Sequence, residues 1–204
     1  MKFYNSIGPN PHVVRMFMAE KGIEIPKEEV DLMKGDNRKA PYSTTKNTMG
    51  QMPALELDGG HCVTEITAIC EYLEDKFPTP ALIGDTPERK AETRKWTRRI
   101  DLNICEPMTN GFRYSQGLAL FEDRIPTLPE AADGLKRIAQ HHLKWLDGEM
   151  AGKEFVCGKR FTLADVLLFC FQDFGNAVGQ PIAPENKNIA AWFERVKQRP
   201  SAKA

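Results

Sequence analysis

The segment 6–22, SIGPNPHVVRMFMAEKG, places a turn directly before a helix with apolar periodicity. Many enzymes carry a nucleophile in a turn of this kind. Position 8 is glycine, however, and the two prolines that follow have no N–H group. The donors that remain are the backbone amides of Gly8, Asn10 and His12 and the Asn10 side chain. Because a helix N-terminus favours negative charge, the turn is suited to hold an anion.

Three further side chains near this turn are candidates for catalysis. Tyr4 and Ser6 lie on or just after the first predicted strand, where Tyr4 can equally serve strand packing. His12 titrates near neutral pH, but a lone histidine in a first helical turn is typical of a capping or surface residue. Asn10 is the preferred catalytic candidate, with Ser6 and Tyr4 as alternatives. Its own alternative use is as a turn former or helix cap.

Several other residues have ordinary structural uses on the sequence alone. Glu65 opens a predicted helix, where a carboxylate suits the positive helix end even without a ligand. Pro53, in GQMPAL, can begin an ordinary strand. Arg38 and Lys39 can be solvated surface charges.

The elements that position these residues follow from apolar periodicity. In chain order the pattern predicts a strand over 2–7, a helix over 12–22, a strand over 25–33, a hairpin over 52–65 that turns at 58–60, and a helix over 64–77. This order predicts a small α/β layer of roughly 80 residues.

The pattern changes after residue 77, where three prolines and a glycine within 77–89 indicate a linker. The long segments that follow are helical in pattern. Residues 87–108 carry Trp96, Ile100 and Ile104 on one stripe. Residues 128–150 carry a second stripe, made of Leu135, Ile138, Leu143 and Leu146.

Another helix start is specified by a capping box, in which Thr162 caps the helix and Asp165 reaches back to the Thr162 amide. We therefore predict an α/β domain over 1–79, a linker over 80–87 and an all-helical domain over 88–204.

The charge balance limits the kinds of partner. Lysine plus arginine and aspartate plus glutamate number 28 each, so no net field draws the chain to nucleic acid or an anionic membrane. No apolar run approaches the roughly 20 residues of a membrane span. The five cysteines form no C-x-x-C pair and no metal-ligand spacing with histidine. We expect a cytoplasmic protein with free, mostly buried thiols, a small-molecule ligand and no metal.

Four segments resemble those of soluble, bacterial-type glutathione S-transferases: GQMPALELD, VTEITAICEYL, FTLADVLL and WFERVKQRPS. The resemblance covers nearly the whole chain. It implies a thioredoxin-like N-terminal domain of βαβαββα order, an all-helical C-terminal domain, a homodimer, and a glutathione site in the cleft between the domains.

The resemblance also implies roles in binding glutathione. Glu65 would hold the γ-glutamyl group, and the Met52 backbone, placed by a cis Pro53, would pair with the cysteinyl part like an added strand. Gln51 would contact the peptide. Ile66 stands where relatives have serine or threonine, so one side-chain hydrogen bond is lost while the Ile66 amide remains.

The remaining implied roles concern the glycine carboxylate and the sulfur. Arg38 and Lys39 lie where related proteins hold the glycine carboxylate. Relatives place tyrosine, serine or cysteine in the opening turn, and the position of the serine or cysteine is Gly8 here. The pair Pro9–Asn10 resembles the T-P-N turn of bacterial nu-class transferases, which implies that Asn10 and nearby amides stabilise the glutathione thiolate.

A pocket for the second substrate is expected next to the opening turn. Its candidate lining is Met108, Phe112, Arg113 and Tyr114, with core packing as the alternative use of the apolar members.

We therefore expect a detoxifying glutathione transferase that adds the glutathione thiolate to an electrophile. One alternative is a glutathione-dependent peroxidase or disulfide reductase of the nu-class kind. The other is a non-catalytic binding or scaffold protein, which Gly8 and Ile66 favour and Gln51, Pro53 and Glu65 oppose.

Overall fold

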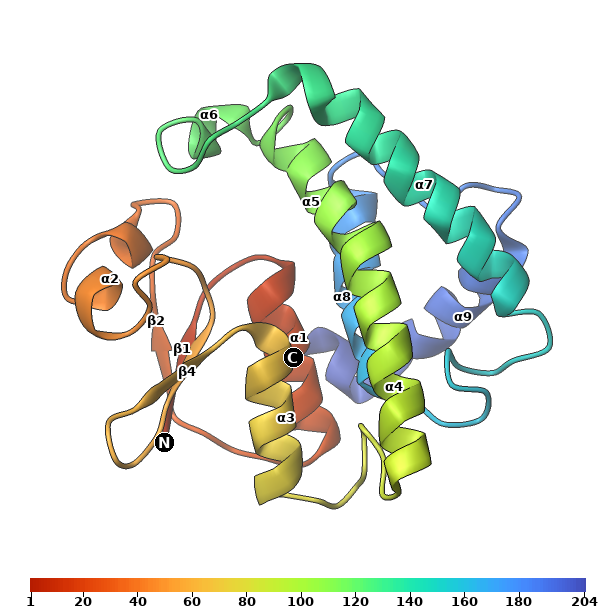
Figure 1. Ribbon diagram of the computed structural model, residues 1–204, viewed down its shortest axis with the longest axis horizontal. Helices are drawn as coiled ribbons and strands as arrows, with labels where there is room; N and C mark the ends of the chain where they lie inside the picture. The colour runs from red at the N-terminus through yellow and green to blue at the C-terminus, as the bar shows by residue number, and fades with distance from the viewer. The chain divides into compact units, whose positions relative to one another are not determined.

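The computed structural model describes residues 1–204, and these form two compact units (Figure 1). Unit 1 consists of Met1–Leu82 together with Lys203–Ala204, and unit 2 consists of Ile83–Ala202. No helix of either unit is long and apolar enough to span a lipid bilayer.

Unit 1 has the predicted βαβαββα order. Its elements are β1 (Lys2–Asn5), α1 (Pro9–Glu20), β2 (Lys27–Glu29), a 3₁₀ turn (Asp36–Arg38), α2 (Tyr42–Thr45), β3 (Ala54–Glu56), β4 (Cys62–Thr64) and α3 (Ile66–Lys76). The strands form one sheet in the order β2-β1-β3-β4, in which only the β1–β2 pair is parallel. Helices α1 and α3 pack side by side (Figure 1).

Strand β1 contributes to both faces of the sheet because successive side chains alternate. Phe3 and its cross-strand partner Leu55 are fully buried. Tyr4 points to the other face, where it belongs to a cluster with Tyr42 and Met52. The Tyr4 and Tyr42 rings meet edge to face with centroids 5.7 Å apart. The segment around α2 is therefore fixed against the sheet by aromatic packing.

Helix α1 begins earlier than its apolar pattern predicts. It starts at Pro9, because proline is tolerated in a first turn where no N–H is needed. It ends at Glu20, just before Gly22, which has a left-handed φ of 63°. The Ile23 N–H then bonds the Met18 carbonyl at 2.9 Å, which closes the last turn.

Unit 2 is all-helical, as predicted. It contains α4 (Pro87–Ile100), a π-helical turn (Asp101–Cys105), α5 (Glu106–Arg113), α6 (Leu118–Phe121), a 3₁₀ turn (Pro129–Ala131), α7 (Ala132–Glu149), α8 (Leu163–Ala177) and α9 (Lys187–Lys197), and a last 3₁₀ turn spans Pro200–Lys203.

The predicted helix over 87–108 continues to Arg113 but is interrupted by the π-helical turn. Pro107 follows this turn and has no N–H to donate to the preceding turn of helix. A wider turn accommodates that missing bond.

The core stripe of α7 differs from the prediction. Leu143 and Leu146 are fully buried and Leu135 is half-buried, but Ile138 is 47% exposed, so its assignment to the core is wrong. Ala139 takes the buried position in its place. The 3.6-residue period places Ala139, not its neighbour, on the same face as Leu143 and Leu146.

The capping box at the start of α8 is present as predicted. Asp165 is fully buried, and its Oδ2 accepts the Thr162 N–H at 2.9 Å. Its Oδ1 accepts the Val156 N–H and the Trp192 Nε1–H, each at 2.9 Å. Burial raises the pKa of this carboxyl to about 6, although the four hydrogen bonds it accepts oppose the rise. One carboxylate thus links α8, α9 and the loop before α8.

Candidate functional site

The opening turn depends on a glycine at position 8. Gly8 is the N-cap residue of α1 and has φ 103° and ψ 171°, a conformation that side-chain-bearing residues rarely adopt. A Cβ atom built on Gly8 would meet no atom within 4 Å. Space for a hydroxyl or thiol is therefore available, and the backbone conformation is what requires glycine.

The start of α1 offers unused hydrogen-bond donors. No side chain caps the helix, so the cap alternative for Asn10 is wrong, and the Asn10 side chain is half-buried in the first turn. The His12 N–H reaches the Gly8 carbonyl at a long 3.4 Å. Because the first amides of a helix have no intrahelical acceptor, the Asn10 N–H is free to bind an anion.

The two alternatives to Asn10 are engaged within the protein. Ser6 is buried, and its hydroxyl donates to the Val30 carbonyl at 2.7 Å. The Tyr4 hydroxyl donates to Glu56 Oε2 at 2.7 Å. Burial raises the Tyr4 pKa above its usual 10, so the phenol stays neutral. Neither hydroxyl is directed at the turn.

Arg15 binds the segment before the turn, a role that the sequence analysis does not predict. Arg15 of α1 donates from Nη1 to Asn5 Oδ1 at 2.8 Å and to the Ser6 carbonyl at 3.1 Å. Its position inside the apolar run VVRMFM is a signal that could have identified it, because a charge placed among buried residues needs partners.

The segment before β3 has the expected cis peptide bond between Met52 and Pro53. The Gln51 carbonyl accepts hydrogen bonds from the Tyr42 hydroxyl at 2.7 Å and from Asn47 Nδ2 at 3.1 Å. The Gln51 side chain is exposed. The hydrogen bonds of loops and turns include none from the Met52 backbone, which leaves that backbone available for pairing.

Glu65 has an unusual backbone. It is the one residue other than glycine with a positive φ, 69°, and it lies immediately before α3 with its side chain exposed. Such a conformation costs about 1–3 kcal/mol and is found preferentially at ligand sites. Ile66, the first residue of α3, is half-buried.

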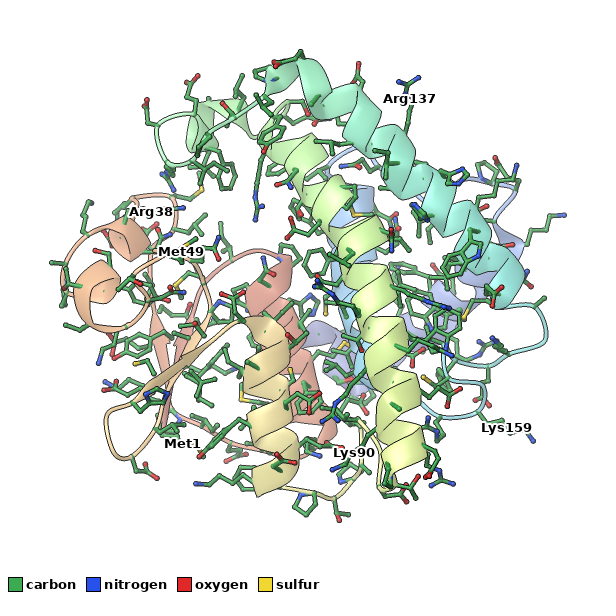
Figure 2. The ribbon with its side chains drawn as sticks, in the orientation of Figure 1. Met1, Arg38, Met49, Lys90, Arg137 and Lys159 are labelled. Atoms are coloured by element: carbon green, nitrogen blue, oxygen red, sulfur yellow. The ribbon has the colours of Figure 1, made fainter.

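The two basic candidates have different surroundings. Arg38 Nη1 donates to the Met49 carbonyl at 3.1 Å, and both residues are labelled in Figure 2. The Arg38 side chain also lies against Gly50, directly before Gln51. Lys39 is exposed and ion-paired with Asp36 at 3.2 Å. Arg38 is therefore the one that the structure places beside the Gln51–Pro53 segment.

Strand register brings three predicted binding segments to one end of the sheet. Tyr4 pairs with Ala54, and Ala54 pairs with Thr64. The end of β1, the start of β3 and the end of β4 therefore lie together. The opening turn follows the first of these, Met52 and Pro53 precede the second, and Glu65 follows the third.

The predicted second-substrate residues of unit 2 are not equally accessible. Met108 is fully buried, and its sulfur packs against Gly175 of α8, so its prediction as a pocket-lining residue is wrong. Helix α5 directs it into the core of unit 2. Phe112 is half-buried, and its ring centroid lies 5.0 Å from that of Phe174. Arg113 Nη1 bonds Asn110 Oδ1 at 2.9 Å, and Tyr114 is half-buried.

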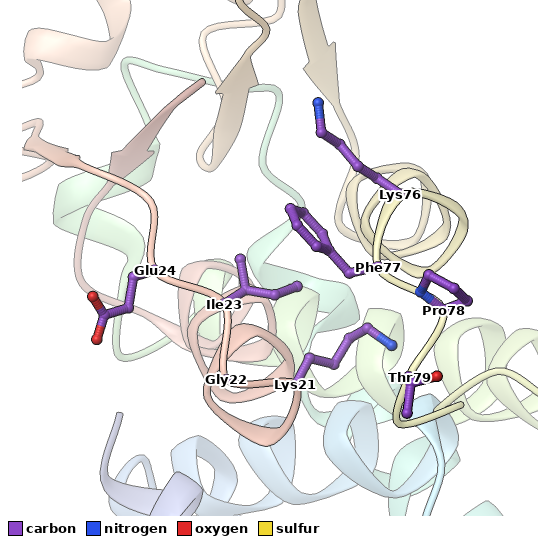
Figure 3. A pocket seen from close by; sticks show the side chains of 8 residues that line it. All are labelled: Lys21, Gly22, Ile23, Glu24, Lys76, Phe77, Pro78 and Thr79. Atoms are coloured by element: carbon purple, nitrogen blue, oxygen red, sulfur yellow. The ribbon is translucent and has the colours of Figure 1, made fainter.

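A cavity of about 360 Å³ lies elsewhere in unit 1 (Figure 3). It is lined by residues at and after the C-terminal ends of α1 and α3, whereas Asn10 and Glu65 lie at the N-terminal ends of these helices. The Lys21 ammonium beside it is buried and paired with Glu74 at 2.7 Å. None of the predicted site residues lines this cavity.

The chain is similar to known proteins over both units. Residues 1–75 match the family model "Glutathione S-transferase, N-terminal domain", and residues 118–200 match "Glutathione S-transferase, C-terminal domain". Glutathione S-transferase 2 of Saccharomyces cerevisiae is 31% identical over 201 residues, which cover 96% of this chain and 84% of the relative.

Solved structures of similar proteins show the same fold over both units. A glutathione S-transferase domain-containing protein of Marinobacter aquaeolei is 31% identical with a TM-score of 0.93, covering 99% of this chain and 100% of that one. The beta-etherase LigF of Sphingobium is 25% identical with a TM-score of 0.83, covering 99% and 96%. With its thioredoxin-like sheet unit, its helical unit and these matches, the chain belongs to the glutathione S-transferase family.

Proposed function

We propose that this protein is a glutathione transferase that holds bound glutathione as a thiolate for attack on an electrophilic, hydrophobic co-substrate. The observation that carries the proposal is the meeting of the opening turn, the Met52–Pro53 segment and Glu65 at one end of the sheet. Glutathione has an ammonium, two carboxylates, a peptide backbone and a thiol, and each of these needs a partner.

Glu65 supports binding of the γ-glutamyl end. Its exposed carboxylate suits the ammonium group, and its backbone conformation fixes where α3 begins. The Ile66 N–H at the helix N-terminus suits the adjacent carboxylate. The hydroxyl that Ile66 lacks would contribute about 1.5–3 kcal/mol to a charged partner, so we expect weaker binding than with serine or threonine.

The segment before β3 supports binding of the rest of the peptide. The Met52 backbone pairs with the cysteinyl part as an added strand would. The exposed Gln51 side chain contacts the peptide, and Arg38 binds the glycine carboxylate. Lys39 has a weaker case than Arg38 because Asp36 already neutralises it.

The thiolate would be stabilised by the Asn10 side chain and by the amides at the start of α1. A free thiol has a pKa near 8.5, and each unit of depression requires about 1.4 kcal/mol. Hydrogen bonds to a charged group contribute about 1.5–3 kcal/mol each, so two donors can lower the pKa below neutral. The sulfur lone pair then forms the bond to the electrophilic carbon, whose leaving group takes the displaced electron pair.

The remaining parts of the proposal concern the co-substrate and the assembly. Phe112, Arg113 and Tyr114 are proposed co-substrate contacts, with Met108 withdrawn because it is buried. We also propose that the protein is a cytoplasmic homodimer.

Two alternative functions are each favoured by specific residues. The similarity of Pro9–Asn10 to the nu-class turn favours peroxide or disulfide substrates for the same thiolate. The absence of a hydroxyl at Gly8 and Ile66 favours a non-catalytic binding protein.

Initial rates distinguish these functions. Glutathione is supplied with an activated aryl chloride, with an organic hydroperoxide, or with a disulfide, and conjugate and oxidised glutathione are measured separately. We expect conjugate formation with the aryl chloride above the uncatalysed rate. Oxidised glutathione without conjugate would support the peroxidase or reductase alternative, and no turnover with any substrate would support the binding protein.

A further inference from the structure

The Arg15 guanidinium joins three parts of unit 1 behind the opening turn. It lies on α1 between residues that are fully buried, and it is itself half-buried. Nη1 donates to Asn5 Oδ1 and to the Ser6 carbonyl, at 2.8 and 3.1 Å. Nε donates to the Ala204 carbonyl at 3.0 Å. One side chain therefore holds α1 against the end of β1.

The end of β1 is fixed from its other side by β2 and the residue after it. Asn5 Nδ2 donates to Glu29 Oε1 at 2.6 Å, and the Val30 N–H donates to the Asn5 carbonyl at 2.9 Å. The Ser6 hydroxyl donates to the Val30 carbonyl at 2.7 Å. Ser6 is therefore bonded to the segment after β2 through its side chain, directly before the turn begins.

The residues that follow Ser6 have few restraints of their own. Ile7 is 61% exposed, and Gly8 has no side chain and no atom near its Cβ position. Between Ser6 and Asn10, the buried Pro9 is the one residue whose ring restricts the backbone, so the path of Ile7 and Gly8 depends on Ser6 before them and on the start of α1 after them. Arg15 contacts both ends, because it belongs to α1, whose first turn contains Asn10, and it binds the carbonyl of Ser6.

We infer that Arg15 is a positioning residue, which orients the Asn10 side chain and the first amides of α1 toward the glutathione sulfur through the Ser6 carbonyl and Asn5. This inference rests on the proposed function. Arg15 makes no bond to substrate in this role, and its effect passes through the turn.

The guanidinium geometry is what the role requires. Arginine presents several N–H donors in a rigid planar fork, whereas lysine is a compact point charge. Nη1 of Arg15 donates to two adjacent residues at the end of β1, Asn5 and Ser6, while Nε donates to Ala204 in a second segment. Arg15→Lys keeps the positive charge and most of the stem but cannot keep this set of bonds. The substitution therefore separates positioning from simple attraction between charges.

The test measures the thiol pKa of bound glutathione by thiolate absorbance in wild type, Arg15→Lys and Arg15→Met. We expect both variants to raise that pKa by about 0.5–1 unit, which is a roughly 3- to 10-fold loss of thiolate at a given pH. Binding of S-methylglutathione, which has no ionisable thiol, should change less than about twofold. In an Asn10→Ala background the effect of Arg15→Lys should become smaller, because one of the donors that Arg15 orients is then missing and interacting residues are not additive.

Lys21→Met is the matched control. Lys21 follows the opposite end of α1 and is buried in an ion pair with Glu74, so its loss destabilises the fold without touching the opening turn. We expect a lower melting temperature and an unchanged bound-thiol pKa. If the Arg15 variants do not fold, Asn5→Ser supplies the same measurement by removing one acceptor of Arg15.

Amide hydrogen exchange in the ligand-free protein gives a readout that needs no glutathione. We expect exchange at residues 8–12 to accelerate in Arg15→Lys and not in Lys21→Met. An unchanged pKa together with unchanged exchange in a folded Arg15→Lys would overturn the inference, as would an equal pKa shift in the Asn10→Ala background. If wild type forms no thiolate, the proposed function is refuted, and so is the role of Arg15 toward the sulfur. The exchange result then still decides whether Arg15 orders the turn.

Discussion

At position 8 the backbone, and not the space around it, decides which residue is allowed. Gly8 adopts φ 103°, and the region around its Cβ position is empty. A serine or cysteine placed there would fit sterically but would strain the backbone. In the proposed function, the donors to the sulfur are therefore the amides of α1 and the side chain of Asn10.

Replacing Asn10 by alanine removes the only side-chain donor proposed for the sulfur. We expect Asn10→Ala to raise the bound-thiol pKa by about 1–2 units and to lower turnover roughly 10- to 100-fold, since a hydrogen bond to a charged group is worth about 1.5–3 kcal/mol. Thiolate absorbance and kcat are the measurements. Asn188→Ala is the control, because Asn188 bonds Asp147 in unit 2. Equal turnover of Asn10→Ala and wild type would transfer the role to the backbone amides alone.

The strained backbone of Glu65 lowers the stability of the fold, and in the proposed function its carboxylate binds glutathione. Glycine adopts a φ of 69° without penalty, so we expect Glu65→Gly to raise the free energy of unfolding by about 1 kcal/mol. The same substitution removes the carboxylate and should weaken glutathione binding at least about tenfold. Urea unfolding and calorimetric titration test the two halves. A variant that is less stable, or that binds glutathione as wild type does, contradicts this account.

At the scale of elements, the carboxylate at the start of α8 makes stability depend on pH. The pKa of Asp165 is raised by burial from its usual 3.8 to about 6. A raised pKa in the folded state means that its contribution is present in full below pH 3.8 and is lost as pH rises through 6. The loss relative to a non-titrating residue is about 3 kcal/mol.

Asp165→Asn isolates this effect. Other carboxyls titrate in both proteins, so the difference in unfolding free energy between wild type and Asp165→Asn reports the one group. We expect that difference to shift against wild type by about 2 kcal/mol between pH 4 and 7, because part of the effect is already present at pH 4. Urea unfolding at half-unit pH steps measures it. A difference that is constant across this range, or that moves in favour of wild type, contradicts the raised pKa.

The elements that the sequence predicts are those with local causes. The hairpin turns at Asp58–Gly60, and the capping box needs only Thr162 and Asp165, so both follow from short spacings. The burial of Met108 and the exposure of Ile138 depend on which neighbouring helix each faces, and that information is not local. The π-helical turn before Pro107 shows the same limit, since proline predicts a disruption but not its form.

Part of the candidate site follows from a motif. The cis Met52–Pro53 bond is predicted from a segment that resembles those of related proteins, and the structure has it. The role of Glu65 comes from the same resemblance and stays a prediction. The hydrogen bonds from Ser6 to Val30 and from Arg15 to Asn5 join residues that are well separated in the chain. No spacing rule connects them before the fold is known.

At the scale of the whole molecule, family membership fixes the fold and leaves the reaction to the site. The family matches cover both units, and the relatives include one named as a beta-etherase. The balanced charge of the chain is compatible with a small-molecule substrate. The proposed function therefore depends on whether the opening turn ionises the thiol of bound glutathione.

The most direct test of that central claim is the pKa of glutathione bound to the wild-type protein. Thiolate absorbance is recorded across pH 5–9 at saturating glutathione, with S-methylglutathione as the blank. The account predicts saturable binding and a bound-thiol pKa at least about one unit below the free value near 8.5. A bound thiol that titrates at the free value, or no binding at millimolar glutathione, would contradict it.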